Sequence, residues 1–117
     1  MILLLTDNIL FASKIAANLQ AAGVALKAVT SPQQLDGAPG EARPDAVLVN
    51  LNARGYDPVE VIGRLKAADP PHTVIAFCGH ADKVTHERGL ASGADRVVAN
   101  SAITMNAAQV LRDTGVI

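Results

Sequence analysis

The sequence contains no tryptophan, and aromatic residues make up only 3% of it. Because 50% of the residues are apolar, a core must be built mainly from aliphatic side chains. The single cysteine, Cys78, excludes an internal disulfide. No apolar run approaches the ~20 residues that cross a bilayer, and the opening "MILLLTDN" has no basic residue of the kind that begins a signal peptide. We expect a cytoplasmic protein with a single domain, residues 1–117.

Charge of neither sign dominates the chain, whose formal net charge is −1. Basic residues are scattered among acidic ones, so bulk electrostatics predicts neither a nucleic-acid partner nor a membrane partner. The glycine-rich phosphate loops G-x-x-x-x-G-K-[ST] and G-x-G-x-x-G are both absent. The sequence therefore carries no signature of a P-loop or dinucleotide-binding protein.

Short apolar runs recur at regular spacing, and they are the candidate strands. They are "ILLL" (2–5), "VALKAV" (24–29), "AVLVNL" (46–51), "TVIAFC" (73–78) and "RVVA" (96–99). The strongest runs are continuous rather than alternating, which is typical of strands buried on both faces of a parallel sheet.

Helix-like stretches separate these runs. The predicted helices are 9–22, 57–68, 82–92 and 104–113. The stretch "SPQQLDGAPGEA" (31–42) is the poorest candidate, because its glycines and prolines favour one or two turns followed by a loop. Alternating strands and helices predict a doubly wound, five-stranded parallel sheet in a three-layer α/β/α sandwich.

In such sheets, function gathers where the strands end at their carboxyl edge. The candidate site residues are the side chains that follow the runs: Thr6, Asp7, Asn8, Asn50, Asn52, Cys78, Gly79, His80, Asn100 and Ser101. Asn50 draws attention among them, since an amide stands where many folds place a reactive carboxylate.

Four segments in order resemble the receiver domain of two-component signalling, the CheY-like module, over nearly the whole chain. They are "ILLLTDN", "PDAVLVNLN", "TVIAFCGHAD" and "GADRVVANSA", and the element "SGAD" (92–95) is especially typical. The resemblance implies a flavodoxin-like (CheY-like) fold and the role of a response regulator in signal transduction or a phosphorelay.

The resemblance also implies a role for individual residues, and most of the reacting groups are replaced. The family's phosphoacceptor aspartate falls on Asn50, and the family's lysine falls on Asn100. The acid pair falls on Thr6 and Asp7, and the switch hydroxyl falls on Cys78. Because an amide cannot form an acyl phosphate, the resemblance implies a degenerate receiver, or pseudo-receiver, that is not phosphorylated at this position.

We expect no cofactor and no bound metal ion. Mg²⁺ in receiver domains depends on more than one carboxylate, and Asp7 alone remains of the acid pair. Residual Mg²⁺ would have to use Asp7 and the backbone carbonyl of Asn52. Asp7 is also a candidate cap for the first helix, and we favour that role. Asn50 would keep the shape of an aspartate while removing a like charge beside Asp7.

Neither the cysteine nor the histidines predict an enzyme. Cys78 and His80 are too close in the chain to adopt nucleophile–base geometry readily, so a buried structural thiol is favoured. His72, His80 and His86 lack the i, i+3 or i+4 spacing of metal ligands on a helix.

The favoured function is a stand-alone module that works by contact with a protein partner or a second copy of itself. The implied partner face comprises helix 82–92, strand 96–99 and helix 104–113, with Val84, Arg88, Ala91, Arg96, Val98 and Met105. The alternative is a small-ligand binding domain. Its crevice at the strand ends would be polar and nearly neutral, with Asp7, Asn50, Asn52, His80 and Asn100.

Overall fold

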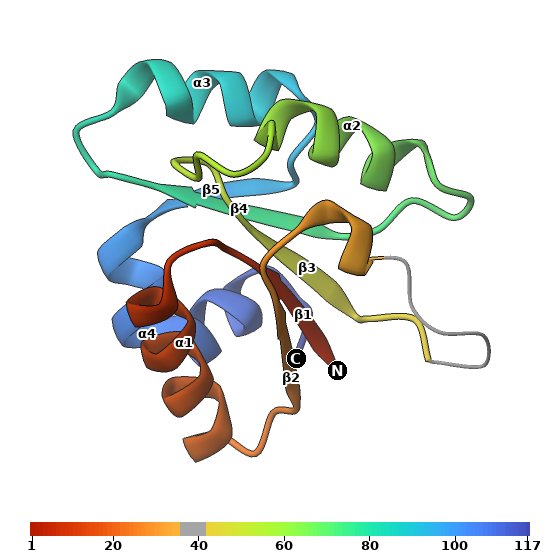
Figure 1. The fold of residues 1–117 in the computed structure, drawn as a ribbon. Coiled ribbons are helices and arrows are strands. Elements are labelled where there is room, and N and C mark those ends of the chain that lie inside the picture. The colour runs from red at the N-terminus through yellow and green to blue at the C-terminus, as the bar shows by residue number, and fades with distance from the viewer. Residues whose placement is uncertain (36–41) are drawn as a thin grey trace.

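The computed structural model describes residues 1–35 and 42–117, which alternate strands and helices (Figure 1). The elements are β1 (Ile2–Leu5), α1 (Ile9–Ala21), β2 (Leu26–Val29), the 3₁₀ turn η1 (Pro32–Leu35), β3 (Ala46–Asn50), α2 (Pro58–Ala67), β4 (Val74–Cys78), α3 (Lys83–Ala91), β5 (Arg96–Ala99) and α4 (Asn100–Asp113). None of the helices in the described ranges is long and apolar enough to span a bilayer.

The strands form one parallel sheet in the order β2-β1-β3-β4-β5. Helices α1 and α4 cover one face of this sheet, and α2 and α3 cover the other (Figure 1). The strand order reverses between β1 and β3, so the carboxyl ends of these two strands border the expected binding crevice. The predicted doubly wound parallel sandwich is confirmed.

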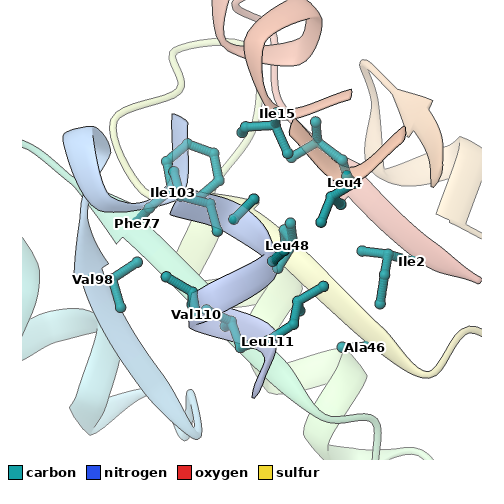
Figure 2. Packing of buried hydrophobic residues seen from close by; sticks show 14 residues of the cluster. Ile2, Leu4, Ile15, Ala46, Leu48, Phe77, Val98, Ile103, Val110 and Leu111 are labelled. Carbon is teal, nitrogen blue, oxygen red and sulfur yellow. The ribbon is translucent and has the colours of Figure 1, made fainter. Parts of the chain in front are cut away.

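The continuous apolar runs supply both faces of the sheet with core residues. Leu4, Leu48 and Phe77 point toward α1 and α4, where Ile15 and Ile103 pack against the sheet (Figure 2). The side chains that alternate with them form a second cluster against α2 and α3. Burial on both faces explains why these strands read as unbroken apolar stretches.

One predicted helix differs from the observed one, whereas the poor candidate 31–42 begins with a short turn, as expected. This turn is η1, and residues 36–41 lie outside the described ranges. The last helix begins at Asn100 rather than at 104, directly after β5, with Ala99 as an N-cap that makes no side-chain hydrogen bond. Asn100 and Ser101, predicted to follow a strand, therefore lie in the first turn of α4.

The "SGAD" element ends α3 and secures the start of β4. Gly93 has φ +109°, a conformation that favours glycine, and it turns the chain toward β5. The Oδ2 atom of Asp95 accepts hydrogen bonds from the amide of Val74 and from Nζ of Lys66, each at 2.8 Å. Burial tends to raise the pKa of Asp95, but these hydrogen bonds and the charge of Lys66 outweigh it, so the pKa is lowered.

Replacing Asp95 with asparagine is expected to lower the free energy of unfolding at pH 7 by about 1 kcal/mol, because the side chain is 40% exposed and its ion pair is partly screened. A lowered pKa in the folded state means that Asp95 stabilises the protein above its ordinary pKa of 3.8. This contribution to stability disappears as the pH falls through the lowered pKa of Asp95. Urea unfolding of wild type and D95N should therefore converge as the medium is acidified below pH 3.8, and a difference that grew on acidification would contradict the assignment.

Candidate functional site

A crevice of about 590 Å³ lies at the carboxyl edge of the sheet, between the ends of β1 and β3. Its lining residues are Asp7, Asn8, Ile9, Leu10, Phe11, Asn50, Asn52, Arg54 and Asn100. The structure thus brings together the predicted pocket residues Asp7, Asn50, Asn52 and Asn100. It does not bring Thr6, Cys78 or His80 into the lining of this crevice.

Asn50, which lines the crevice, and Thr6 form a buried polar pair at the ends of β3 and β1. Their exposed fractions are 3% and 2%. The Nδ2 group of Asn50 donates to Oγ1 of Thr6 at 3.0 Å, and Oδ1 of Asn50 accepts from the amide of Asn52 at 2.9 Å. The Thr6 oxygen also accepts from the amide of Asn8 at 3.1 Å. The amide at position 50 thus uses both its donor and its acceptor, whereas an ionised carboxylate could only accept.

Asp7 ties two loops together instead of capping α1. Its Oδ2 atom accepts from the backbone amides of Arg54 at 3.0 Å and Gly55 at 3.3 Å, in the loop that follows β3. The predicted cap role is therefore wrong. Asn8 is the N-cap, in extended conformation, and its Oδ1 atom accepts from the amide of Phe11 at 3.1 Å. Asp7 lies one residue too early for the cap position.

Asn52 connects the end of β3 to the loop that follows β4. Its Oδ1 atom accepts from the amide of Gly79 at 3.0 Å, and its Nδ2 group donates to Oδ2 of Asp82 at 3.2 Å. Asp82 is the N-cap of α3, and its hydrogen bonds with Thr85, followed by a smaller effect of Asn52, lower its pKa. Both polar atoms of the Asn52 side-chain amide therefore form hydrogen bonds at the rim of the crevice.

Tyr56, which sequence reasoning missed, joins the carboxyl ends of β1 and β3. Its hydroxyl lies 3.1 Å from the carbonyl oxygen of Leu5 and 3.0 Å from that of Asn50. Burial, followed by the charge of Asp7, raises the pKa of Tyr56 above its ordinary value of 10.0. The phenol therefore stays a hydrogen-bond donor to the strand ends. The one available signal was that this is the only tyrosine in the sequence.

The thiol of Cys78 is buried, as predicted. It is only 1% exposed and belongs to the core cluster beneath α2 and α3. Burial, followed by the charge of Asp82, raises the pKa of the Cys78 thiol. A thiol that is buried and hard to ionise is a poor nucleophile.

Asn100 lies at the mouth of the crevice as the first residue of α4. Its Oδ1 atom is buried without a hydrogen-bond partner. It offers the crevice an acceptor and an uncharged amide, but no ammonium group.

The donor atoms of the crevice do not fit Mg²⁺. A magnesium ion takes about six oxygen ligands, usually with more than one carboxylate or phosphate among them. Asp7 supplies the one carboxylate in the lining, and its Oδ2 atom already accepts two backbone amides. Across residues 1–35 and 42–117 there is no group of three or more His, Cys, Asp or Glu side chains that could hold a metal ion.

The predicted partner face is partly exposed and partly buried. Val84 on α3 and Met105 on α4 are 67% and 68% exposed. Arg88 is exposed and Arg96 is half-buried. Val98 was wrongly placed on this face: it is 8% exposed and packs in the core toward α4 (Figure 2). The reason is that α3 and α4 cover opposite faces of β5, so neither face of that strand is free.

Comparison with known proteins supports the fold. No family model matches the sequence, and no curated protein sequence matches it. A response regulator receiver protein from Burkholderia phymatum superposes with a TM-score of 0.79 at 24% identity, covering 99% of this chain and 95% of that chain. The chemotaxis protein CheY4 of Vibrio cholerae superposes with a TM-score of 0.79 at 17% identity, covering 97% and 96%.

A structure described as adenylate cyclase from Rhodopirellula baltica also superposes, with a TM-score of 0.77 at 18% identity over 98% of this chain and 85% of that chain. Fold alone does not separate signalling domains from parts of enzymes. The similar structures are nevertheless mostly described as receiver domains or response regulators. The chain has the receiver-domain, CheY-like fold of response regulators.

Proposed function

We propose that this chain is a degenerate receiver domain that acts in signalling through protein contacts, without phosphorylation at the end of β3. The observation that carries the proposal is Asn50. It occupies the strand end where a receiver presents its phosphoacceptor, it is 3% exposed, and its amide donates to Thr6. An amide in this position has no nucleophilic oxygen to offer a phosphoryl group.

The neighbouring groups fit the same interpretation. Phosphoryl transfer needs positive charge around the transferred oxygens. Asn100 stands at the lysine position with an uncharged amide, and Thr6 stands in place of one acid of the metal-binding pair. Cys78, at the hydroxyl position, is buried in the core. The proposal therefore includes no catalysis, no cofactor and no resident metal ion.

The proposed partner is a protein or a second copy of this chain, and neither a nucleic acid nor a membrane. The surface offered is formed by α3, β5 and α4, with the exposed side chains of Val84 and Arg88 on α3 and of Met105 on α4. Sedimentation velocity of wild type and of the V84E and M105E variants tests the second-copy option. Self-association that both charges abolish is the expected result if this face pairs with itself.

The phosphorylation part of the proposal predicts no adduct when the wild-type protein is incubated with acetyl phosphate and Mg²⁺. Intact-mass spectrometry measures this directly, because a phosphoryl group adds a fixed mass. The N50D variant restores a carboxylate at the acceptor position and serves as the matched comparison. An adduct on N50D alone would show that the missing acceptor is the limiting feature.

An adduct on the wild-type protein would contradict the proposal, and peptide mapping would locate it. Modification of Asp7 would mean that the crevice uses a displaced acceptor. The D7N variant provides the control for that outcome, since it removes the last carboxylate of the crevice lining.

A second candidate function, small-ligand binding in the crevice, rests on Asn100. Its Oδ1 atom is buried without a partner, and the residue lines a crevice of about 590 Å³ together with the apolar side chains of Ile9 and Leu10. A ligand with an N–H or O–H donor would satisfy that oxygen. A thermal-shift screen with nucleotides, flavins and divalent ions tests this candidate. Stabilisation of wild type but not of N100A would favour it over the protein-contact function.

A further inference from the structure

Helix α4 consists of two helical pieces that meet at Asn106. This residue has φ −137° and ψ 41°, outside the helical range, while the residues on both sides continue the helix to Asp113. The leading piece, residues 100–105, begins with Asn100 at the crevice and ends with Met105 on the outer surface. A break of this kind interrupts the backbone hydrogen-bond ladder and calls for an identifiable cause.

Asn18 of α1 supplies that cause. Its Nδ2 group donates to the carbonyl oxygen of Met105 at 2.7 Å, and its Oδ1 atom accepts from the amide of Ala108 at 3.2 Å. One side-chain amide thus satisfies a backbone acceptor before the break and a backbone donor after it. Only asparagine and glutamine carry an uncharged donor and acceptor side by side in this way.

The surrounding packing holds this amide in place. Ile15 and Leu19, which flank Asn18 on α1, are fully buried in the same core cluster as Ile103 and Ala107 of α4. The facing surfaces of the two helices are therefore fixed on each side of the break. Asn106 itself is exposed, so its own side chain does not anchor the break in the core.

The leading piece of α4 is braced as a unit. The hydroxyl of Thr104 donates to the carbonyl oxygen of Asn100 at 2.9 Å. Ile103 anchors the piece to the sheet with no exposed surface (Figure 2). Asn100 and Met105 are consequently the two ends of one short rigid segment whose orientation depends on the break.

We propose that Asn18 is a positioning residue that imposes the break in α4 and thereby sets Asn100 toward the crevice and Met105 on the outer face. The importance of Met105 for partner contact rests on the proposed function. The geometric assignment does not, because it concerns only how α1 holds α4. A disturbance at either end of the leading piece would be passed to the other end through this segment.

The experiment uses the two methionines of the chain as reporters. With ¹³C-methyl methionine, the N18A variant is expected to shift the Met105 methyl signal and to leave that of Met1 unchanged. The amide of Ala108 is expected to exchange with solvent about tenfold faster, the factor that corresponds to the loss of one hydrogen bond. The amides of β3 and β4 should keep their wild-type protection.

The N18D variant separates the two hydrogen bonds. A carboxylate still accepts from Ala108 but cannot donate to Met105. Ala108 is therefore expected to remain protected, while the Met105 methyl signal still shifts. The Q20A variant, an exposed position of the same helix, is the matched control and should change neither reporter.

The proposal is overturned if N18A leaves both Met105 and Ala108 unchanged. It is also overturned if all core amides accelerate by the same factor, since Asn18 would then be an ordinary packing residue. If N18A does not fold, N18D decides by the pattern given above, and failure of both variants to fold would equally assign Asn18 to general stability. None of these readouts needs a partner or a phosphate donor, so the result is independent of the proposed function.

Discussion

The N50D variant is expected to lose about 2–4 kcal/mol of unfolding free energy at pH 7 relative to wild type. Asn50 is 3% exposed, and its Nδ2 group donates to Thr6. A carboxylate in its place must be desolvated. The crevice lining holds another carboxylate, Asp7, and one basic side chain, Arg54, which is exposed. Burial of a poorly compensated charge carries a penalty of this order.

The pH dependence identifies the cause of that loss. Burial and the charge of Asp7 would both raise the pKa of the new carboxyl above its value in the unfolded chain. Because the pKa is raised in the folded state, the carboxyl carries no charge penalty at a pH below its unfolded-state pKa. The penalty grows as the pH rises from the unfolded-state pKa toward the folded-state pKa. Urea unfolding of N50D should therefore approach that of wild type near pH 4. A loss that stayed constant with pH would show that charge burial is not responsible.

The N8D variant is the matched control for N50D. It adds the same charge to the lining of the same crevice, at a half-buried position. Asn8 is the N-cap of α1, and aspartate caps helices about as well as asparagine. We expect N8D to change the stability by no more than about 0.5 kcal/mol. An equal loss in both variants would indicate general repulsion with Asp7 rather than burial at position 50.

The sequence was sufficient to predict the fold because its signals are local. Continuous apolar runs mark strands that helices cover on both faces. The N-caps Asp57 and Asp82 and the first-turn Pro58 lie within a residue or two of the predicted helix starts. The error at Val98 came from the resemblance and not from this rule, because the run "RVVA" (96–99) is itself continuous, as in a strand covered on both faces.

The candidate site was only partly predictable for the opposite reason. The strand ends could be located, so Asn50, Asn52 and Asn100 were found as crevice residues. The partners of Asp7 and the contacts of Tyr56 depend on how the loop after β3 folds back across the strand ends. Asn18 lies 87 residues from Met105 in the chain, and no periodicity links the two. Side chains that bond to distant backbone atoms leave no local pattern.

Replacing Thr6 with valine is expected to destabilise the protein by about 2–4 kcal/mol, although the two side chains have nearly the same shape. The Thr6 hydroxyl oxygen accepts from Nδ2 of Asn50 and from the amide of Asn8. Valine would leave both donors without this acceptor, at a cost of about 1–3 kcal/mol for each buried donor. Equilibrium unfolding in urea measures the loss.

Two further variants separate the hydroxyl from the packing around it. T6S keeps the oxygen and removes a methyl group, so it should cost about 1 kcal/mol, less than T6V. The double variant T6V/N50L removes the donor as well as the acceptor, and should be less destabilised than the sum of T6V and N50L, with a coupling of about 0.5–3 kcal/mol. Strict additivity would mean that Thr6 and Asn50 do not stabilise each other. A clear coupling would mean that Thr6 and Asn50 serve mainly to hold the ends of β1 and β3 together, as the proposed loss of phosphorylation implies.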